Sequence, residues 1–242
     1  MNILILTAGQ EQSQKENYPL CLVEFNSMPL IQRVIDSCKK LEPRSLIVTF
    51  RAEEMHRYHL DSIVKLLWPA AKIINVQEGT QGAACTALLA ASVIDSDEEL
   101  LVLNANELLG IDFLDIVQDF RFRQLDAGVA VFHSIHPRYS YVKTDANGFV
   151  IEAAEKKPIS TNATAGFYWF SKGKFLVHAA KNLIRKDARV NGAFYICPTF
   201  NELILEHRRI GIYPIDSKNY HPLKSGRQIE QFEGELKKGE YV

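Results

Sequence analysis

Short apolar runs alternate with amphipathic stretches along most of the chain. The runs are mainly aliphatic, which is typical of buried strands, and they cover residues 3–6, 45–50, 72–76, 100–104 and 127–132. Between them, apolar residues at helical spacing predict helices over about 29–40, 53–67 and 113–125. Strands and helices in alternation predict a parallel sheet that is covered by helices on both faces.

The pattern changes after the fifth run. Residues 139–144 and 149–151 have the composition of two strands, and Asp145–Gly148 lies between them. Asn147 and Gly148 are expected to supply the two positive-φ positions of a tight turn. An antiparallel unit of this kind would make the predicted sheet mixed.

The remaining pattern completes one domain. It predicts a helix over 174–185, a strand over 210–216 and a closing helix over 228–237. We find no repeat or linker, and a chain of 242 residues is long enough to bury one full core. The predicted fold is therefore α/β: a single Rossmann-like, three-layer domain over residues 1–242, with a mixed, mainly parallel sheet.

The first strand ends in a segment that is suited to a nucleotide. Leu6-Thr7-Ala8-Gly9 follows the apolar run, and a polar loop separates it from the first helix. In open parallel sheets, backbone N–H groups and a helix N-terminus converge past the carboxyl end of the first strand. Ala8 and Gly9 would let a ligand approach the backbone closely, because neither has a bulky side chain.

A second segment rich in small residues follows the third strand. Gln77-Glu78-Gly79-Thr80-Gln81-Gly82-Ala83-Ala84 leads into a helix. Small residues here would let the backbone lie against a flat ligand, such as a nucleobase. The alternative is close packing of helix on sheet, which needs small residues without any ligand.

These segments resemble the motifs of the sugar nucleotidyltransferases, the nucleoside-diphosphate-sugar pyrophosphorylase family. Leu6-Thr7-Ala8-Gly9 is similar to the family's opening loop, and Ser27-Met28-Pro29-Leu30-Ile31 to the start of its first helix. The most specific match runs from Ser140 to Phe170 and includes Glu155-Lys156. The resemblance covers essentially the whole chain and implies the nucleotidyltransferase (GT-A type) fold.

The resemblance also implies a set of site residues and ligands. The ligands are a nucleotide or nucleotide sugar, and a sugar phosphate. The nucleotide is expected at Leu6, Ala8, Gly9, Gln77, Gly82 and Ala83. The substrate is expected at Asn104, Asn106, Glu155, Lys156, Thr164, Gly166 and Tyr195.

The chain departs from the family where the phosphates are handled. Glu11, with Ser13 or Gln14, stands where the family has its second loop glycine and its arginine, and Leu20 stands where it has a lysine. Glu11 would repel a phosphate if it pointed inward, or it turns out into solvent.

The metal-binding aspartate of the family is also replaced. Asn106 stands in its place, and an amide oxygen brings no charge to Mg²⁺, which usually relies on one or two carboxylates. We therefore predict no metal site, and Mg²⁺ only if catalysis survives. The catalytic candidates are Lys15, the neighbouring carboxylate Glu107 and Lys156, and Lys143 and Lys224 are further cations that could neutralise phosphate.

Three functions remain open at this stage. The first is transfer of a nucleoside monophosphate from a triphosphate to a sugar 1-phosphate, with an altered catalytic centre, in nucleotide-sugar and surface-polysaccharide biosynthesis. The second is a silent protein that binds a nucleotide sugar or regulates a partner enzyme. The third is a glycosyltransferase of the same broad fold, because Asn104-Ala105-Asn106 has the spacing of a D-x-D motif without its charge.

Composition narrows the setting. A net charge of -1 gives no electrostatic signature for nucleic acid or an anionic membrane. No apolar run has the length of a membrane span, and no basic region precedes the first run, so we expect a cytoplasmic protein. Four scattered cysteines suggest reduced thiols, and the pairs His56/His59 and His133/His136 lack a third ligand for a metal. A homo-oligomer or a complex with a polysaccharide enzyme is possible.

Overall fold

A nine-stranded mixed sheet forms the centre of the molecule in the computed structural model, which describes residues 1–7, 18–77, 79–223 and 226–237. One half of the sheet is parallel, in the order β6-β1-β4-β5. Its strands are β1 (Asn2–Leu6), β4 (Ser45–Arg51), β5 (Lys72–Val76) and β6 (Leu100–Asn104). The predicted strands at 72–76 and 100–104 have the observed bounds.

The other half of the sheet is organised around β11 (Asn162–Phe170), which runs antiparallel to β6. The strands of this half are β8 (Ala127–His133), β9 (Tyr141–Thr144), β10 (Val150–Ala154) and β12 (Ile210–Pro214). β11 also pairs with β8 and β9, and its register to β8 shifts between Thr164 and Tyr168. This bulge lies beside the end of β6, and bulges re-aim side chains at such places.

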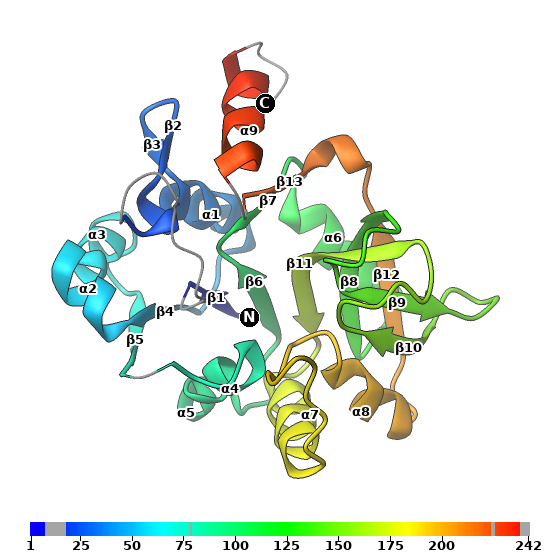
Figure 1. The fold of residues 1–242 in the computed structure, drawn as a ribbon. Helices are drawn as coiled ribbons and strands as arrows, with labels where there is room; N and C mark the ends of the chain where they lie inside the picture. Colours follow the sequence, from blue (N-terminus) through cyan, green and yellow to red (C-terminus); the bar gives the residue numbers. More distant parts are fainter. Residues whose placement is uncertain (8–17, 78, 224–225, 238–242) are drawn as a thin grey trace.

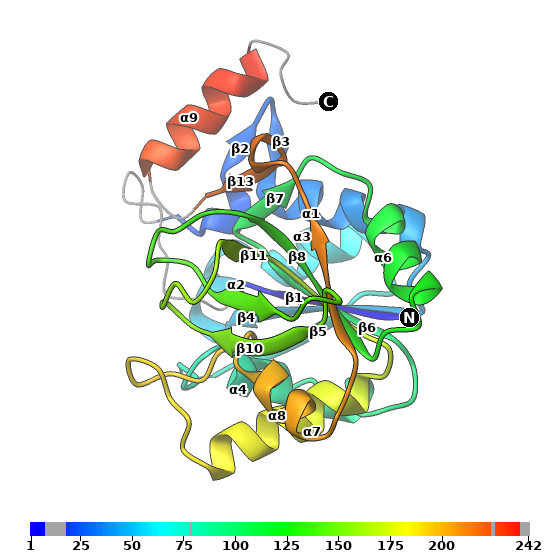
Figure 2. The same cartoon turned by 90° about the vertical axis from the view of Figure 1, so that its right-hand side faces the viewer.

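Helices cover both faces of the sheet, as Figure 2 shows. α1 (Leu30–Cys38), α3 (Leu60–Leu67) and α6 (Phe113–Phe122) lie on one face. α4 (Ala83–Leu88), α7 (Gly173–Arg185) and α8 (Thr199–Leu205) lie on the other, together with the short α5 (Ala91–Ile94).

The alternation of side chains along β1 explains the two cores. Ile3 and Ile5 belong to the apolar cluster under α1, whereas Leu4 between them belongs to the cluster under α7. Successive side chains of a strand point to opposite faces, so a strand that is covered on both faces must be apolar throughout. This confirms the α/β class and the mixed sheet between helical layers.

A smaller substructure stands above the sheet in Figure 1. It comprises the hairpin of β2 (Glu24–Phe25) and β3 (Met28–Pro29), the pair β7 (Glu107–Leu109) and β13 (Tyr220–Pro222), and α9 (Gly226–Lys237). Phe232 of α9 packs edge-on against Phe25, with ring centroids 5.1 Å apart. Helix α9, near the end of the described chain, thereby packs against the hairpin of β2 and β3 near its start.

Two local predictions were wrong. The helix predicted over 53–67 is two helices, α2 (Ala52–Tyr58) and α3, because His59 between them adopts a left-handed conformation with φ 52°. In the turn before β10 only Gly148 has a positive φ. Asn147 instead donates its backbone N–H to Asp145 Oδ1, which also accepts from Phe149 N, both at 2.9 Å.

No helix within the described ranges is both long enough and apolar enough to cross a bilayer.

The cysteines of the described structure are unpaired, and three of them are buried in the cores. Burial raises the pKa of Cys21 to about 12, and burial raises the pKa values of Cys38 and Cys197 still more strongly out of the usual range. Cys85 on α4 is partly exposed. Burial also raises its pKa, while Arg189 nearby acts in the opposite direction.

Native labelling with a disulfide reagent at pH 8 should therefore select Cys85. A pKa of about 12 in place of 9.0 lowers the thiolate fraction of Cys21 roughly 1,000-fold, and only the thiolate reacts. We expect one thiol to react in the folded chain and four after unfolding. Cys85→Ser should abolish native labelling, and rapid labelling of Cys21 in peptide maps would contradict the packing described here.

A matched pair of glycines tests the core. At Gly128 on β8 a Cβ would lie 2.6 Å from the Phe120 ring, whereas at Gly234 on α9 it would meet nothing within 4 Å. Gly128→Ala should lower the free energy of unfolding by about 1–3 kcal/mol through overpacking. Gly234→Ala should raise it by about 0.5–1 kcal/mol, because alanine favours the helix. Urea unfolding of both variants measures the difference.

Candidate functional site

The end of β1 lies between the ends of its two neighbours. Leu6 pairs with Thr49 of β4 on one side and with Asn104 of β6 on the other. The backbone continues this arrangement, because Thr7 N donates to Thr49 Oγ1 at 3.3 Å and Ala105 N donates to Leu6 O at 3.1 Å. Leu6 and Asn104, both predicted site residues, are therefore neighbours at the carboxyl ends of the parallel strands.

The rest of the opening loop lies outside the described residues. This applies to Ala8, Gly9 and Lys15, and to Glu11, Ser13 and Gln14, which replace family residues. Lys224 is likewise outside them. The expected roles of these residues stay predictions.

Glu107 lies in a network of buried polar groups beside Asn104. Its side chain is 9% exposed, Oε1 accepts from the Tyr220 hydroxyl at 3.1 Å, and Oε2 accepts from Asn104 Nδ2 at 3.2 Å. A carboxylate in such a place needs donors, because burial of an unpaired charge is costly. The pair of donors fixes both oxygens of Glu107.

The carboxylate also requires a glycine opposite it. Gly166 lies in the bulge of β11 with φ 70°, and a Cβ there would lie 1.6 Å from Glu107 Oε2. No side chain can share that space. The glycine that the resemblance placed in the substrate site therefore serves Glu107 in this chain.

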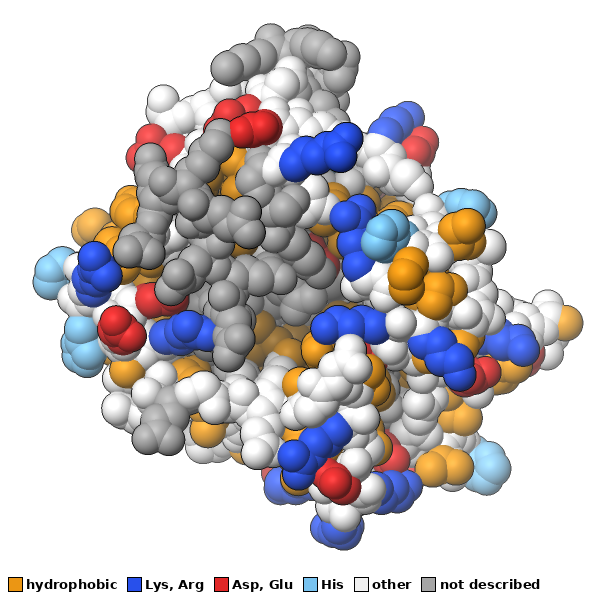
Figure 3. Space-filling model, viewed as in Figure 1, with side chains coloured by type: hydrophobic (Ala, Val, Ile, Leu, Met, Phe, Trp, Pro, Cys, Tyr) orange, Lys and Arg blue, Asp and Glu red, His pale blue; other side chains and the backbone are white. Residues whose placement is uncertain are grey.

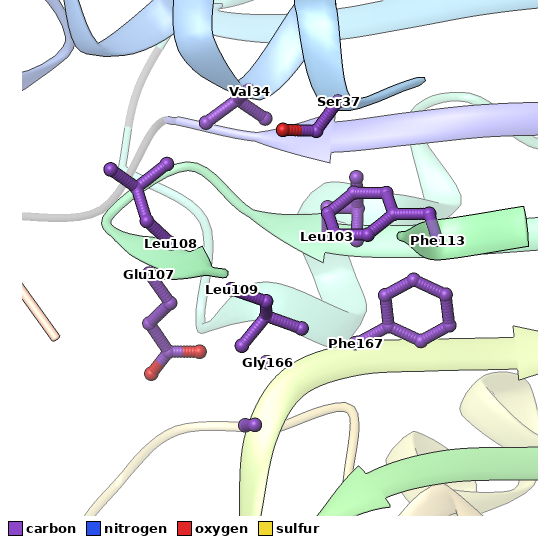
Figure 4. A pocket seen from close by; sticks show the side chains of 10 residues that line it. Val34, Ser37, Leu103, Glu107, Leu108, Leu109, Phe113, Gly166 and Phe167 are labelled. Carbon is purple, nitrogen blue, oxygen red and sulfur yellow. The ribbon is translucent and has the colours of Figure 1, made fainter. Parts of the chain in front are cut away.

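A small cavity of about 10 Å³ adjoins this network (Figure 4). The Glu107 carboxylate lies near Gly166 at one side, while Phe113 and Phe167, with ring centroids 5.1 Å apart, lie at the other. Such a volume suffices for about one water molecule. The cavity is thus part of the floor of the site and too small for a sugar.

The pKa of Tyr220 follows from its place. Burial raises it well above the usual value, and the negative charge of Glu107 raises it further. The phenol consequently keeps its proton across the physiological range. Tyr220 therefore donates its hydroxyl hydrogen to Glu107 in that range.

Mg²⁺ is the metal that the family resemblance implies, and the described donors do not fit it. The Asn104 amide points its N–H group at Glu107, both Glu107 oxygens already accept from protein donors, and Asn106 is neutral. Within the described ranges no group of three or more His, Cys, Asp or Glu side chains could hold a metal ion. Since Mg²⁺ on protein usually needs a carboxylate ligand, we derive no step through a metal.

Glu155 belongs to a second set of polar side chains, which surround the buried Tyr168. The Ser140 hydroxyl donates to Glu155 Oε2, and Thr164 Oγ1 lies 2.9 Å from the Tyr168 hydroxyl. Burial raises the pKa of Tyr168 well above its usual value, and charges at Glu155 and Glu107 add to this. Thr164 of this set and Gly166, which faces Glu107, are two residues apart on β11, so one strand joins the two sets of polar residues.

Lys156 follows Glu155 and has an unusual backbone. Its φ is 53°, in the left-handed region that non-glycine residues seldom adopt. Its ammonium donates to the Tyr195 hydroxyl at 3.0 Å and lies 5.0 Å from the centre of the same ring. The predicted pair Lys156 and Tyr195 is thus in direct contact.

The predicted base segment is in contact with the residue before Tyr195. Phe194 N donates to Gln81 O at 2.7 Å, and Ala84 N donates to Phe194 O at 3.0 Å. At Gly82, φ is 110° and a Cβ would lie 2.3 Å from Phe194 O. Gly82 is therefore required for close packing, which is the alternative explanation of this segment.

Nothing in the sequence pattern indicates the role of Asn201 of α8. Its side-chain amide donates to Ala153 O at 2.8 Å, and its Oδ1 accepts from Ala153 N at 2.9 Å. These bonds occupy both backbone groups of a residue two positions before Glu155. Asn201 thereby holds the strand from which the Glu155-Lys156 loop starts.

Three further predicted residues have other environments. Gln77 is exposed directly after β5. Asn106 is half-buried, and its backbone oxygen accepts from Leu223 N at 2.9 Å. Lys143, proposed as a compensating cation, is exposed on β9. The structure brings most of the predicted substrate residues together near the carboxyl ends of the parallel strands.

The carboxyl ends of the parallel strands face the viewer in Figure 3. In Figure 2 β1 runs from the N-terminus on the right toward the left, which is the side seen in Figures 1 and 3. Lys and Arg side chains are spread over this face among acidic and uncharged ones. Glu155 can accept hydrogen bonds from the hydroxyls of a sugar, and Lys156 offers a cation to a phosphate.

Known proteins resemble the chain in sequence. It is 26% identical to the bifunctional protein GlmU of Thermotoga sp. (strain RQ2) over 209 residues, which are 83% of this chain and 44% of that protein. It is 29% identical to GlmU of Trichormus variabilis over 203 residues, which are 76% of this chain and 43% of the relative. The chain thus spans less than half the length of these curated relatives.

Solved structures share the fold. A nucleoside-diphosphate-sugar pyrophosphorylase from Vibrio cholerae RC9 superposes with a TM-score of 0.82 at 21% identity, over 97% of this chain and all of that one. A putative glucose-1-phosphate thymidylyltransferase from Bacillus anthracis, in complex with a sucrose, gives a TM-score of 0.77 at 15% identity, over 96% and 94% of the two chains.

A family model described as nucleotidyl transferase matches residues 13–198, which include β4, β6 and the Glu155-Lys156 loop. The match spans most of the chain and contains Asn104, Glu107, Glu155 and Lys156, whereas Tyr220 lies beyond it. The chain belongs to the nucleotidyl transferase family.

Proposed function

We propose that the protein acts on a nucleoside triphosphate and a sugar 1-phosphate, with a catalytic centre that has lost part of its charge. The observation that carries the proposal is that Glu155 and Lys156, adjacent in one loop, are held by Ser140 and Tyr195 in a chain of this family. These side chains match the chemistry of a phosphorylated sugar.

Each group has a role that its chemistry supports. The Glu155 carboxylate, oriented by Ser140, accepts hydrogen bonds from sugar hydroxyls. The Lys156 ammonium neutralises the sugar phosphate. The small residues Gly82 and Ala83 at the start of α4 let a nucleobase lie against the backbone.

The reaction itself needs alignment and charge neutralisation. An oxygen of the sugar phosphate attacks the α-phosphorus of the triphosphate, a new P–O bond forms, and pyrophosphate leaves with the electrons of the broken bond. Rate enhancement in such transfers comes from positioning the reactants and stabilising charge on the phosphates.

Two described positions lack the expected charge. Leu20 is buried among apolar residues, and Asn106 is neutral. Loss of one preorganised charge-stabilising group costs about 100- to 1,000-fold in rate, and such losses are not additive. We therefore propose slow nucleotidyl transfer.

A non-catalytic role is the second candidate, and the state of Glu107 favours it. This carboxylate lies nearest to the family's metal position, yet its oxygens are engaged by Tyr220 and Asn104. A protein with this centre could bind a nucleotide sugar and regulate a partner without turning it over.

An assay of pyrophosphate release distinguishes the two candidates. The protein is incubated with each common nucleoside triphosphate, glucose 1-phosphate or mannose 1-phosphate, and Mg²⁺. We expect release at least roughly 100-fold slower than in an ordinary pyrophosphorylase, because charge is missing, and loss of this activity in Lys156→Met. Rapid release would contradict the argument from missing charge, and no release would favour the non-catalytic role.

Calorimetry tests the argument about the metal. Because the described donors do not fit Mg²⁺, the affinity of the wild type for a nucleotide sugar should change less than about threefold when EDTA replaces Mg²⁺. Asn106→Asp adds a carboxylate and should introduce a dependence on Mg²⁺. Strong Mg²⁺ dependence in the wild type would overturn this reading, and absence of nucleotide and sugar binding would remove both candidate functions.

A further inference from the structure

A short hairpin connects the predicted base segment, Gln77 to Ala84, with Lys156. Val190 N donates to Ala193 O at 2.9 Å and Ala193 N donates to Val190 O at 3.1 Å, which closes a two-residue turn. Asn191 has φ 49° and Gly192 has φ 79°. Positive φ at both central residues is the conformation that Asn-Gly favours in the tightest hairpins. The segment Val190–Tyr195, called here the Asn-Gly hairpin, is therefore a locally determined unit between α7 and α8.

One side of the Asn-Gly hairpin is attached to the predicted base segment. Phe194 exchanges backbone hydrogen bonds with Gln81 and Ala84, and its carbonyl occupies the space that a side chain at position 82 would need. The Arg189 guanidinium lies 5.2 Å from the centre of the Phe194 ring. A displacement of the start of α4 would consequently displace Phe194.

The other side of the hairpin holds the predicted phosphate cation. Tyr195 is the next residue along the chain, and its hydroxyl accepts from Lys156 Nζ at 3.0 Å. Lys156 is exposed, and a free lysine side chain loses much rotamer entropy when a ligand fixes it. The contact with Tyr195 restricts Lys156 before any ligand arrives.

We propose that Tyr195 is a positioning residue for Lys156, and that the Asn-Gly hairpin couples the base segment at Gly82 to the cation that binds the sugar phosphate. The inference rests on the proposed function, since it assigns Lys156 to a phosphate. Tyr195 acts through Lys156 and makes no contact with the reacting atoms.

A double-mutant cycle tests the positioning role. The probes are glucose 1-phosphate and mannose 1-phosphate, with glucose and mannose as uncharged controls, and affinities are measured by calorimetry. Tyr195→Phe keeps the ring and removes the acceptor, so it should weaken sugar phosphate binding roughly three- to tenfold and leave binding of the uncharged sugars unchanged. Lys156→Met should weaken it at least as much, and the double variant should bind no more weakly than Lys156→Met alone.

A tyrosine away from the site provides the matched control. Tyr213 of β12 packs against Phe120, and Tyr213→Phe should not change the affinity for either sugar phosphate. Additive losses in the double variant, or an unchanged affinity in Tyr195→Phe, would overturn the positioning role.

A glycine pair tests the coupling. Gly82→Ala should push on Phe194 and weaken sugar phosphate binding severalfold, although position 82 is on the base side. Gly79→Ala on the same loop, where a Cβ meets nothing within 4 Å, should have no effect. Equal affinities in the two variants would overturn the coupling.

The two levels of the argument fail differently. If the wild type binds neither sugar phosphate, the proposed function fails and the inference fails with it. If the wild type binds but Tyr195→Phe and Gly82→Ala bind equally well, the inference alone fails.

Discussion

A carboxylate inside a protein must be supplied with hydrogen-bond donors, and at Glu107 this requirement determines the architecture of the site. One donor comes from Asn104 at the end of β6, the other comes from Tyr220 on β13, and the bulge of β11 contributes Gly166 to make room. Three segments that are far apart in the sequence therefore meet at one side chain. Removal of one partner from such a buried charge is generally more destabilising than replacement of the whole group, so these positions depend on one another. Glu107 also directly follows Asn106 in the sequence.

The arrangement of the sheet was largely readable from the sequence, because strands that are buried on both faces must be apolar throughout. The run at 100–104, whose first four residues are buried, matches β6, and the run at 72–76 matches β5. The wrong predictions concern positions where the conformation of the backbone, and not the pattern of apolar residues, determines the structure. Nothing in an amphipathic pattern distinguishes a continuous helix from two helices that are joined at His59 with φ 52°. Two positive φ angles are expected at Asn147 and Gly148, but the pair Asn191 and Gly192 adopts that conformation instead. At Asn147 the difference arises because the Asp145 side chain accepts hydrogen bonds from the backbone of the turn.

The site was predictable only in its local part. The segment around Glu155-Lys156 stands in one continuous motif, and the structure places its members together. Tyr220, Asn201 and Phe194 are essential to the arrangement, yet each acts on a residue from another part of the chain. No periodicity or spacing signals a contact of that kind.

The pairing of β13 with β7 has a consequence for the biosynthesis of the protein. Glu107 and Tyr220 are 113 residues apart. A ribosome adds about 5–20 residues per second, so the nascent chain carries Glu107 for roughly 6–23 seconds before its partner tyrosine is made. During that interval the sheet strands β1, β4, β5 and β6 are already available to pair, whereas the floor of the pocket has no second donor from β13. Formation of the Glu107 network is in this way separated in time from formation of the parallel half of the sheet.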